Sequence, residues 1–540
     1  MKEMDTSDEQ NIPGRILFRR YLPGIVVALV FFFWGAVSLH DFGVTYDEIT
    51  TYRAALLNVD LLTGSLPEGV SPYSRHELPG YHFVVDSARG FFSTAMTALG
   101  VMDLPTSFHF FHLVLSALAV FLVYHLVLSV SGRARTAFFS ALTLALFTKF
   151  IAHSQNNPKD LTGLFFFVLS LSLLTTWLFR GRVWRSVATG VVLGIAFATH
   201  VITLFVPVIA GIWLVLTRRD ELRLKWRRIV IAASVAPVFF VLSWPWLWAA
   251  PVERIVTAYR ILSTFSVKMS VLFFGQLVPW SDTPWYYFLG SFAVSTPVLY
   301  LLLALPALYL LFTRVPDQQH LRETAVLGLV WCAVLVLADL RAASHYDGIR
   351  HFLAFLPGYA LLVGVGCDSL LIRAETRSPA SPGSRLARNG TIAVLGAVYL
   401  VAAVQIARIH PYEDAYLNEV TNALLPGPAE DSFEVEYWGS SAREAAAWLN
   451  RNAEPDAQFY YVWSDNANFY LTRPAAVFDP SAFFNDTTRP RYLMLMTRRS
   501  FYDADLRRVE KEYQPVYSIT RQKGTLMNIY KNTVKRGGAA

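Results

Sequence analysis

Apolar runs of close to twenty residues recur along the first four hundred residues of the chain. They begin near residues 22, 107, 136, 160, 187, 229, 289, 323, 351 and 391. A hydrocarbon core of ~30 Å needs about 20 mainly apolar residues per helix. The pattern therefore predicts a polytopic α-helical membrane protein. We interpret the first run, Ile25 to Leu39, as an uncleaved anchor and not as a signal peptide.

Basic residues cluster in the segments that we predict to be cytoplasmic. The densest cluster comprises Arg218, Arg219, Arg223, Lys225, Arg227 and Arg228. Arg185 and Arg218 can both lie on the cytoplasmic side only if Ser186–Thr217 crosses the membrane an even number of times. We therefore predict two short helices that meet near Thr199-His200. The total is then about eleven spans. The N-terminus is predicted to be cytoplasmic and everything after about residue 408 to lie outside.

Composition supports a membrane protein and excludes several other classes. Hydrophobic residues make up 54% of the chain and charged residues only 16%, which is too apolar for a soluble enzyme or a disordered chain. The formal net charge of +7 is explained by cytoplasmic loops, so we predict no nucleic-acid partner. Two cysteines cannot form a disulfide framework or a Cys-based zinc site.

The last 130 or so residues have a different pattern and predict a second domain. Residues 1–407 are predicted to form the transmembrane domain, with an outer loop at 40–106, and residues 408–540 a small extracytoplasmic α/β domain. Within the second domain we expect two helices, two strands and a closing hairpin. These are Ser441–Asn450 and Asp503–Tyr513 (helices), Gln458–Trp463 and Arg491–Met496 (strands), and Val516–Tyr530 (hairpin).

Two adjacent carboxylates, Asp47 and Glu48, follow the first span. Neighbouring side chains on a helix diverge by ~100°, so the two cannot share one target. One can act on a reacting group while the other positions a substrate; alternatively, the pair is a solvated first helical turn. Later in the same outer loop, His76 and His82 are candidates for binding an anionic substrate, although a solvated loop also explains them.

A short outer connection carries His153, Asn157, Lys159 and Asp160 immediately before an apolar run. Asn157 and Asp160 suit a turn and a helix cap, and Asp160 is a plausible N-cap. That interpretation does not explain a lysine next to an aspartate at membrane depth. We therefore consider the segment a second candidate for substrate binding.

A third outer connection ends in Arg350 and His351, which lead directly into an apolar run. Arginine forks match phosphate oxygens well, so phosphate binding is the favoured interpretation. The nearby His345, Asp347 and His351 could instead suggest a metal, but their spacing matches no established site. No metal ligand is predicted, and divalent-metal dependence stays open.

The order of these motifs resembles the GT-C glycosyltransferases. The resemblance is to the protein O-mannosyltransferase and aminoarabinose-transferase superfamily, which uses polyprenyl-phosphate sugars. It includes His410-Pro411-Tyr412, Tyr416-Leu417-Asn418 and the run Phe433–Ser441. The resemblance implies that Asp47 is the catalytic base, that Asp160 is the acid heading the fourth span, and that the anomeric centre is inverted. Leu78-Pro79-Gly80 departs from the family pattern, so the acceptor cannot be inferred.

The residue types agree with that chemistry. A polyprenyl phosphate is a good leaving group, so the reaction needs a base and cations for the phosphate. We assign Asp47 as base, Glu48 to acceptor positioning, Asp160 to orientation, and Lys159, Arg350 and His351 to phosphate. The predicted partners are a polyprenyl-phosphate sugar, membrane lipid, and a protein, lipid or glycan acceptor, at the inner or plasma membrane. The alternatives are a transporter or flippase, and a non-catalytic assembly protein.

Overall fold

The structure, a computed structural model, describes residues 14–70, 81–178, 182–264, 269–313, 318–340, 346–376, 382–486 and 488–532. Helices dominate the first four hundred residues. They are α1 (Gly14–Val37), α2 (Tyr46–Thr63), α3 (Phe83–Ala98), α4 (Leu104–Ser131), α5 (Ala134–Ala145), α6 (Thr148–His153), α7 (Asp160–Ser172), α8 (Trp184–Thr199), α9 (Val206–Thr217), α10 (Arg219–Leu242), α11 (Pro251–Thr264), α12 (Tyr287–Ser295), α13 (Val298–Leu303), α14 (Leu305–Phe312), α15 (Gln319–Asp339), α16 (Phe355–Thr376) and α17 (Pro382–Ile409).

Within the described residues, six helices are long and apolar enough to cross a membrane. They are Phe18–Val37, Leu104–Ser131, Asp160–Trp177, Gln319–Asp339, Phe355–Thr376 and Arg385–Ile409. A seventh is added if α12 and the α13–α14 segment, bent by 110°, count as one broken span. The predicted membrane helical fold is confirmed, whereas the count of about eleven stays a prediction. Several predicted runs form helices that are too short, such as the 12 residues of α5, or too charged, such as α10.

The predicted pair of short helices within Ser186–Thr217 is present. Helix α8 ends at Thr199, His200 adopts an extended backbone, and a 3-10 turn, η3 (Val201–Phe205), leads into α9. Because the chain breaks at His200, its imidazole is free to turn towards the neighbouring helix α7.

A five-stranded mixed sheet follows α17, with strand order β4-β3-β5-β7-β6. Its strands are β3 (Gln458–Val462), β4 (Ala476–Val477), β5 (Arg491–Met496), β6 (Pro515–Arg521) and β7 (Gly524–Asn532), accompanied by α18 (Glu419–Leu424), α19 (Ala442–Asn452), α20 (Pro480–Asn485) and α21 (Ala504–Glu512). The predicted helices and strands of this region are found within two residues of their expected bounds. Central β5 is buried at every position, so it anchors the sheet.

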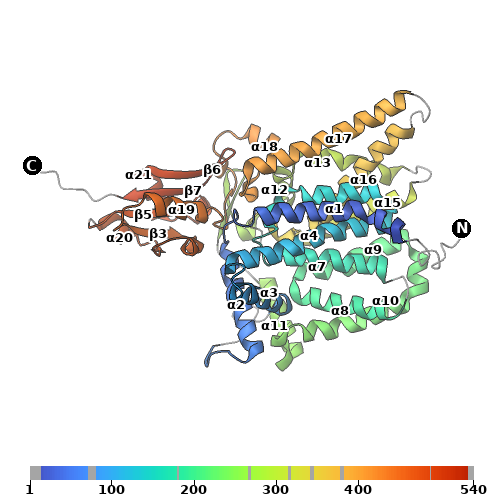
Figure 1. Cartoon of the computed structure of the whole chain (residues 1–540), viewed down its shortest axis with the longest axis horizontal. Helices are drawn as coiled ribbons and strands as arrows, with labels where there is room; N and C mark the ends of the chain where they lie inside the picture. Colours follow the sequence, from blue (N-terminus) through green and yellow to red (C-terminus); the bar gives the residue numbers. More distant parts are fainter. Residues whose placement is uncertain are drawn as a thin grey trace, which may run out of the picture.

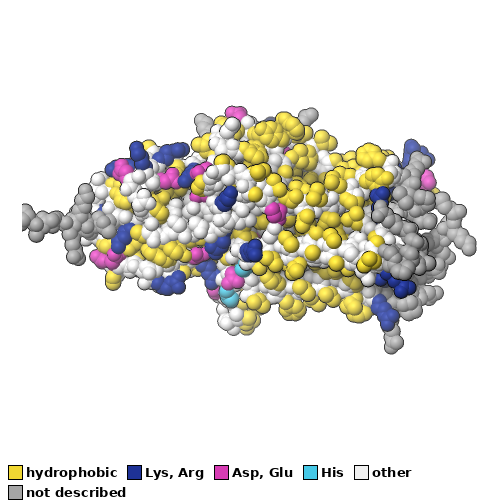
Figure 2. Space-filling model, turned by 90° about the horizontal axis from the view of Figure 1, so that it is seen from above, with side chains coloured by type: hydrophobic (Ala, Val, Ile, Leu, Met, Phe, Trp, Pro, Cys, Tyr) yellow, Lys and Arg dark blue, Asp and Glu magenta, His cyan; other side chains and the backbone are white. Residues whose placement is uncertain are grey.

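The sheet lies at one end of the helical bundle, and α1 begins at the other end (Figure 1). A hairpin of β1 (Ser270–Phe273) and β2 (Gln276–Pro279) contacts the chain leading to the sheet, through a bridge between Phe273 and Phe433. Apolar side chains cover the flank of the bundle, whereas charged side chains gather over the sheet and at the far end (Figure 2). This distribution suits a bundle embedded in lipid with both ends in water.

Candidate active site

Asp47 occupies the first turn of α2, where a capping box fixes the backbone. Thr45 is the N-cap, and its amide donates to Oε2 of Glu48, 2.7 Å away. Such a box satisfies two free amides at the helix start. Asp47 is thereby held on a rigid turn, and its side chain diverges from that of Glu48.

Lys159 and Asp160 stand at the start of α7. The side chain of Asn157 accepts a hydrogen bond from the Asp160 amide, at 3.0 Å. The N-cap position of α7 belongs to Lys159 and not to Asp160, as we had expected. The Asp160 carboxylate is instead directed towards other side chains, because Asp160 is already the first helical residue. Buried Arg89 of α3 donates to the Pro158 carbonyl at 3.2 Å and secures this turn against the rest of the bundle.

Arg350 begins a 3-10 turn, η6 (Arg350–Phe352), just before α16. Its Nη1 lies 3.1 Å from Oδ2 of Asp47 and 3.1 Å from Oδ2 of Asp347. Its Nε lies 3.8 Å from Oδ2 of Asp160. Lys159 completes the group, with Nζ 3.4 Å from Oδ1 of Asp47. Four residues predicted from three separate loops, Asp47, Lys159, Asp160 and Arg350, therefore form one ionic cluster.

The members of this cluster differ in their access to solvent. The side chains of Lys159 and Asp47 are 31% and 19% exposed, whereas those of Arg350 and Asp160 are only 9% and 8% exposed. An incoming molecule would therefore meet Asp47 and Lys159 first. Arg350 and Asp160 lie behind them and set the electrostatic environment.

His200 orients Asp160 and was missed as a site residue, because the sequence pattern indicated only a helix break there. Its Nδ1 accepts the Ile202 amide at 3.2 Å, which leaves the proton on Nε2 to be donated to Oδ1 of Asp160, 3.2 Å away. Gly163 makes this approach possible. A Cβ at position 163 would lie 2.7 Å from Cγ of His200, so any larger residue would displace the ring.

The chain before the sheet also contributes to the site. The guanidinium of Arg350 lies 4.7 Å from the centre of the Trp438 ring, at cation–π distance. Buried Glu436 accepts hydrogen bonds from the amides of Trp438, Gly439 and Ser441, at 2.9–3.1 Å. Glu436 thus shapes the loop that holds Trp438 over Arg350. The resemblance had included this run without a role for either residue.

Glu48 does not join the cluster. Its carboxylate is fully buried and accepts from the Thr45 amide and from the Tyr52 hydroxyl, at 2.9 Å, while Nε2 of His109 lies 3.0 Å away. Acceptor positioning requires a side chain that an acceptor can reach. The geometry therefore corrects the expected role of Glu48 to one of holding α2 against α4.

The histidine candidates fall into different places. His153 is buried with its ring 5.0 Å from the Trp438 ring, and Nδ1 lies 3.3 Å from Nδ2 of Asn157. His351 packs against Tyr346, with ring centres 4.4 Å apart. His82, at the start of α3, is buried with its ring 6.1 Å from that of His200. His76 lies outside the described residues.

Electrostatics favour an ionised Asp47 beside neutral histidines. Burial raises the pKa of Asp47, but the cations of Lys159 and Arg350 outweigh burial and hold the pKa below its usual value. Burial, reinforced by nearby cations, lowers the pKa of His351 to about 4 and that of His153 to about 3. Asp347 and Asp47 overcome the opposing effect of burial and raise the pKa of Arg350. Asp47 is thus an ionised carboxylate at neutral pH, in contact with the side chains of Lys159 and Arg350.

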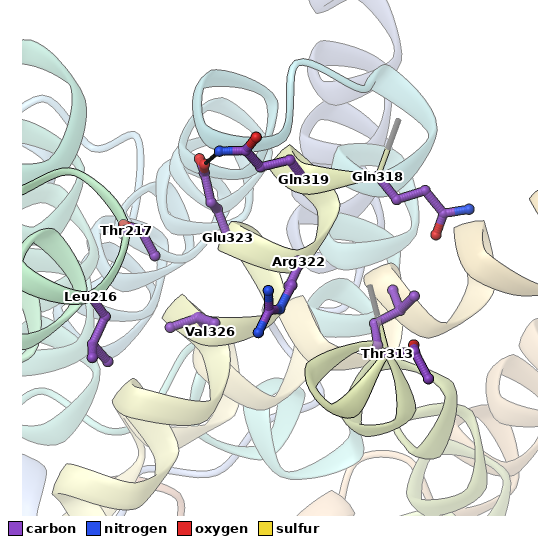
Figure 3. A pocket seen from close by; sticks show the side chains of 9 residues that line it. Leu216, Thr217, Thr313, Gln318, Gln319, Arg322, Glu323 and Val326 are labelled. Atoms are coloured by element: carbon purple, nitrogen blue, oxygen red, sulfur yellow. Dashed lines mark hydrogen bonds between the residues drawn. The ribbon is translucent and has the colours of Figure 1, made fainter. Parts of the chain in front are cut away.

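A cavity of about 470 Å³ lies elsewhere, near the start of α15 (Figure 3). Arg322 points into it, and Gln319 donates to Glu323 at its edge. The 21-residue α15 separates this cavity from the end that leads to Arg350, a length of about 30 Å at 1.5 Å per residue. No predicted site residue lines it. Among the described residues, no group of three or more His, Cys, Asp and Glu side chains is arranged to hold a metal ion.

One family model matches part of the chain. Residues 89–246 match the model of the family described as dolichyl-phosphate-mannose-protein mannosyltransferase, a stretch that includes Asn157–Asp160 and His200. No curated protein matches the sequence.

Two solved structures are similar in outline. One is the oligosaccharyltransferase of Archaeoglobus fulgidus tethered to an acceptor peptide, at 12% identity and TM-score 0.48, covering 94% of this chain and 74% of that one. The other is the arabinofuranosyltransferase AftD from Mycobacteria, at 15% identity and TM-score 0.37, covering 89% of this chain and 41% of AftD. The match over residues 89–246 supports a membrane glycosyltransferase of the GT-C superfamily.

Proposed function

We propose that the protein transfers a sugar from a polyprenyl-phosphate donor to an extracytoplasmic acceptor, with inversion of the anomeric carbon. The observation that carries the proposal is the contact of one carboxylate, Asp47, with two cations from distant segments, Lys159 and Arg350. A displacement at a phosphorylated sugar needs this combination of a base and cations.

In the proposed reaction, Asp47 removes the proton from an acceptor hydroxyl or amine. The acceptor atom forms a bond to the anomeric carbon, and the bond from that carbon to the phosphate oxygen breaks. The electron pair leaves with the polyprenyl phosphate, whose added negative charge Lys159 stabilises directly. Lys159 is the most exposed cation of the cluster, which supports this role. No general acid is required, because the phosphate leaves as an anion.

Arg350 stabilises the same negative charge on the phosphate from a more buried position than Lys159. Its guanidinium is shared among carboxylates at 3.1–3.8 Å, so it must exchange one of them for a phosphate oxygen if it binds the donor directly. His351 is neutral at pH 7 and can donate one hydrogen bond without adding charge. Asp160, held by His200 and Asn157, keeps Arg350 in place.

The test uses the full chain in lipid nanodiscs with a panel of radiolabelled polyprenyl-phosphate sugars. The proposal predicts that at least one donor releases free polyprenyl phosphate when membrane extract is added as a source of acceptor. Release that requires a nucleotide sugar, or no release with any lipid-linked donor, would contradict the proposed donor class. The anomeric configuration of the product, read by NMR, tests inversion separately.

A further inference from the structure

Asp347 joins two buried arginines that come from opposite parts of the chain. Its Oδ2 lies 3.1 Å from Nη1 of Arg350, and its Oδ1 lies 2.6 Å from Nη2 of Arg498. Arg498 stands two residues beyond β5, the central strand of the sheet. The side chains of the three residues are only 4–9% exposed. One carboxylate therefore connects the sheet to the ionic cluster.

Arg498 is held firmly at its own end. Its Nη1 donates to the Tyr437 carbonyl at 3.2 Å, Nη2 lies 3.4 Å from Glu434, and the guanidinium lies 4.0 Å from the Phe501 ring centre. The Ser500 hydroxyl in turn donates to Glu434. These contacts hold the Arg498 guanidinium beside Asp347.

Burying four charges, those of Asp347, Arg350, Arg498 and Glu434, is costly, because desolvation offsets much of the attraction between them. A well-packed apolar group would serve stability as well. The backbone also accommodates the bridge, since Asp347 and Gly348 both have positive φ, at 56° and 63°. Aspartate tolerates this left-handed region better than most residues. The arrangement therefore suits a geometric role for Asp347.

The geometry also reveals a competition. Asp347 and Asp47 both contact Nη1 of Arg350, each at 3.1 Å. Arg498 neutralises Asp347 from its other side. Without Arg498, the unbalanced Asp347 carboxylate would attract Arg350 more strongly and draw it away from Asp47.

We infer that Arg498 is a positioning residue, through which the C-terminal sheet balances Asp347 and keeps Arg350 directed at Asp47. The inference rests on the proposed function. The other groups facing Asp47 are Lys159, Asp160, Tyr46 and Tyr346. Those facing Arg350 also include Tyr346, His351, His153 and Tyr437. Arg498 contacts Tyr437, Asp347, Glu434 and Phe501, and its described contacts do not include Lys159, Asp160 or Tyr46, so an altered response of Asp47 would report the bridge.

The experiment compares donor kcat and KM from pH 4 to 8 for the full chain in nanodiscs. Its variants are Arg498→Ala, Arg498→Lys, Asp347→Asn and the double variant, and the control is Arg508→Ala, which removes an exposed ion pair of α21. We expect Arg498→Ala to lower kcat/KM about tenfold, the equivalent of one lost charge-assisted contact. It should also move the acidic limb of the pH–rate profile to higher pH. Arg350 is then drawn away from Asp47, and a weaker contact with this cation raises the pKa of Asp47.

The double variant gives the sharpest outcome. Asp347→Asn removes the unbalanced carboxylate, so Arg498→Ala/Asp347→Asn should be more active than Arg498→Ala and should recover the wild-type acidic limb. Arg498→Lys should recover part of the activity. If Arg498 had only a structural role, the double variant would be no more active than Arg498→Ala, and neither variant would show a pH shift. That result would overturn the inference. If Arg498→Ala does not fold, Arg498→Lys with and without Asp347→Asn makes the same comparison.

Failure of the proposed function would be recognised separately, as a wild-type protein that turns over no lipid-linked sugar. In that case the bridge is tested by thermal unfolding without substrate. Shifts in Tm that are non-additive between Arg498→Lys and Asp347→Asn would support the bridge, and additive shifts would overturn it.

Discussion

The carboxylate of Asp47 lies between two cations, with Oδ2 3.1 Å from Nη1 of Arg350 and Oδ1 3.4 Å from Nζ of Lys159. Each oxygen thus has its own partner, from η6 on one side and from the start of α7 on the other. A base held in this way is ionised and close to the cations that would receive a phosphate.

Lys159 is expected to control use of the lipid donor. Lys159→Met keeps most of the length of the side chain and removes its charge, so the donor KM should rise about tenfold or more. Lys159→Arg should recover part of this loss. Steady-state kinetics with varied donor, beside the exposed control Lys511→Met, measures the effect. An unchanged donor KM in folded Lys159→Met would remove Lys159 from the phosphate site.

The kcat/KM of the wild type should not fall as the pH is lowered to about 6. Lys159 and Arg350 hold the pKa of Asp47 below its ordinary value of 3.8, so the base stays ionised as the pH falls from 8 to 5. Removing a cation raises that pKa, so Lys159→Met should move the acidic limb upwards. A pH profile of kcat/KM checks both statements. An acidic limb near pH 6.5 in the wild type would instead indicate a histidine base.

Glu48 is expected to contribute to folding and not to acceptor binding. Glu48→Gln replaces one acceptor oxygen by an amide donor, which cannot accept from both the Thr45 amide and the Tyr52 hydroxyl. The free energy of unfolding should fall by about 1–3 kcal/mol. Thermal unfolding measures this loss against the exposed control Glu512→Gln. An unchanged Tm with a raised acceptor KM would restore the role first expected from the sequence.

Gly163 is expected to be required for activity through His200. In Gly163→Ala the new Cβ would lie 2.7 Å from the His200 ring, so the ring must move away from Asp160. We expect kcat to fall while the protein stays folded. The matched control is Gly396→Ala in α17, where nothing lies within 4 Å of the added Cβ. If Gly163→Ala has wild-type kcat, the hydrogen bond from His200 to Asp160 is not needed.

The ionic residues of the site could be predicted from the sequence better than the residues that hold them in position. Asp47, Lys159, Asp160 and Arg350 could be found because charges beside apolar runs are costly and therefore conspicuous. His200 and Arg498 could not be found in this way. His200 looks like a helix break, and Arg498 follows an ordinary strand. Their roles depend on partners, Asp160 and Asp347, that no local period or motif connects to them.

The fold shows a similar division. The apolar runs and the break at His200 could be predicted, because hydrophobic length and loop charge act locally. The count of about eleven membrane spans stays a prediction, because α5 and α8 are shorter than a full span and α10 begins with charged residues. Glu48 was misjudged for a related reason, since its burial is produced by α4, through His109, and not by its own segment.

The central claim is that Asp47 is the base, and Asp47→Asn tests it most directly. The asparagine keeps the size of the side chain and cannot take a proton. General-base catalysis typically contributes ~10²–10⁴-fold, so kcat with a saturating lipid-linked sugar should fall by at least about a hundredfold. The variant should be expressed and should melt close to the wild type. Folded Asp47→Asn that transfers sugar at a rate near that of the wild type would contradict the account.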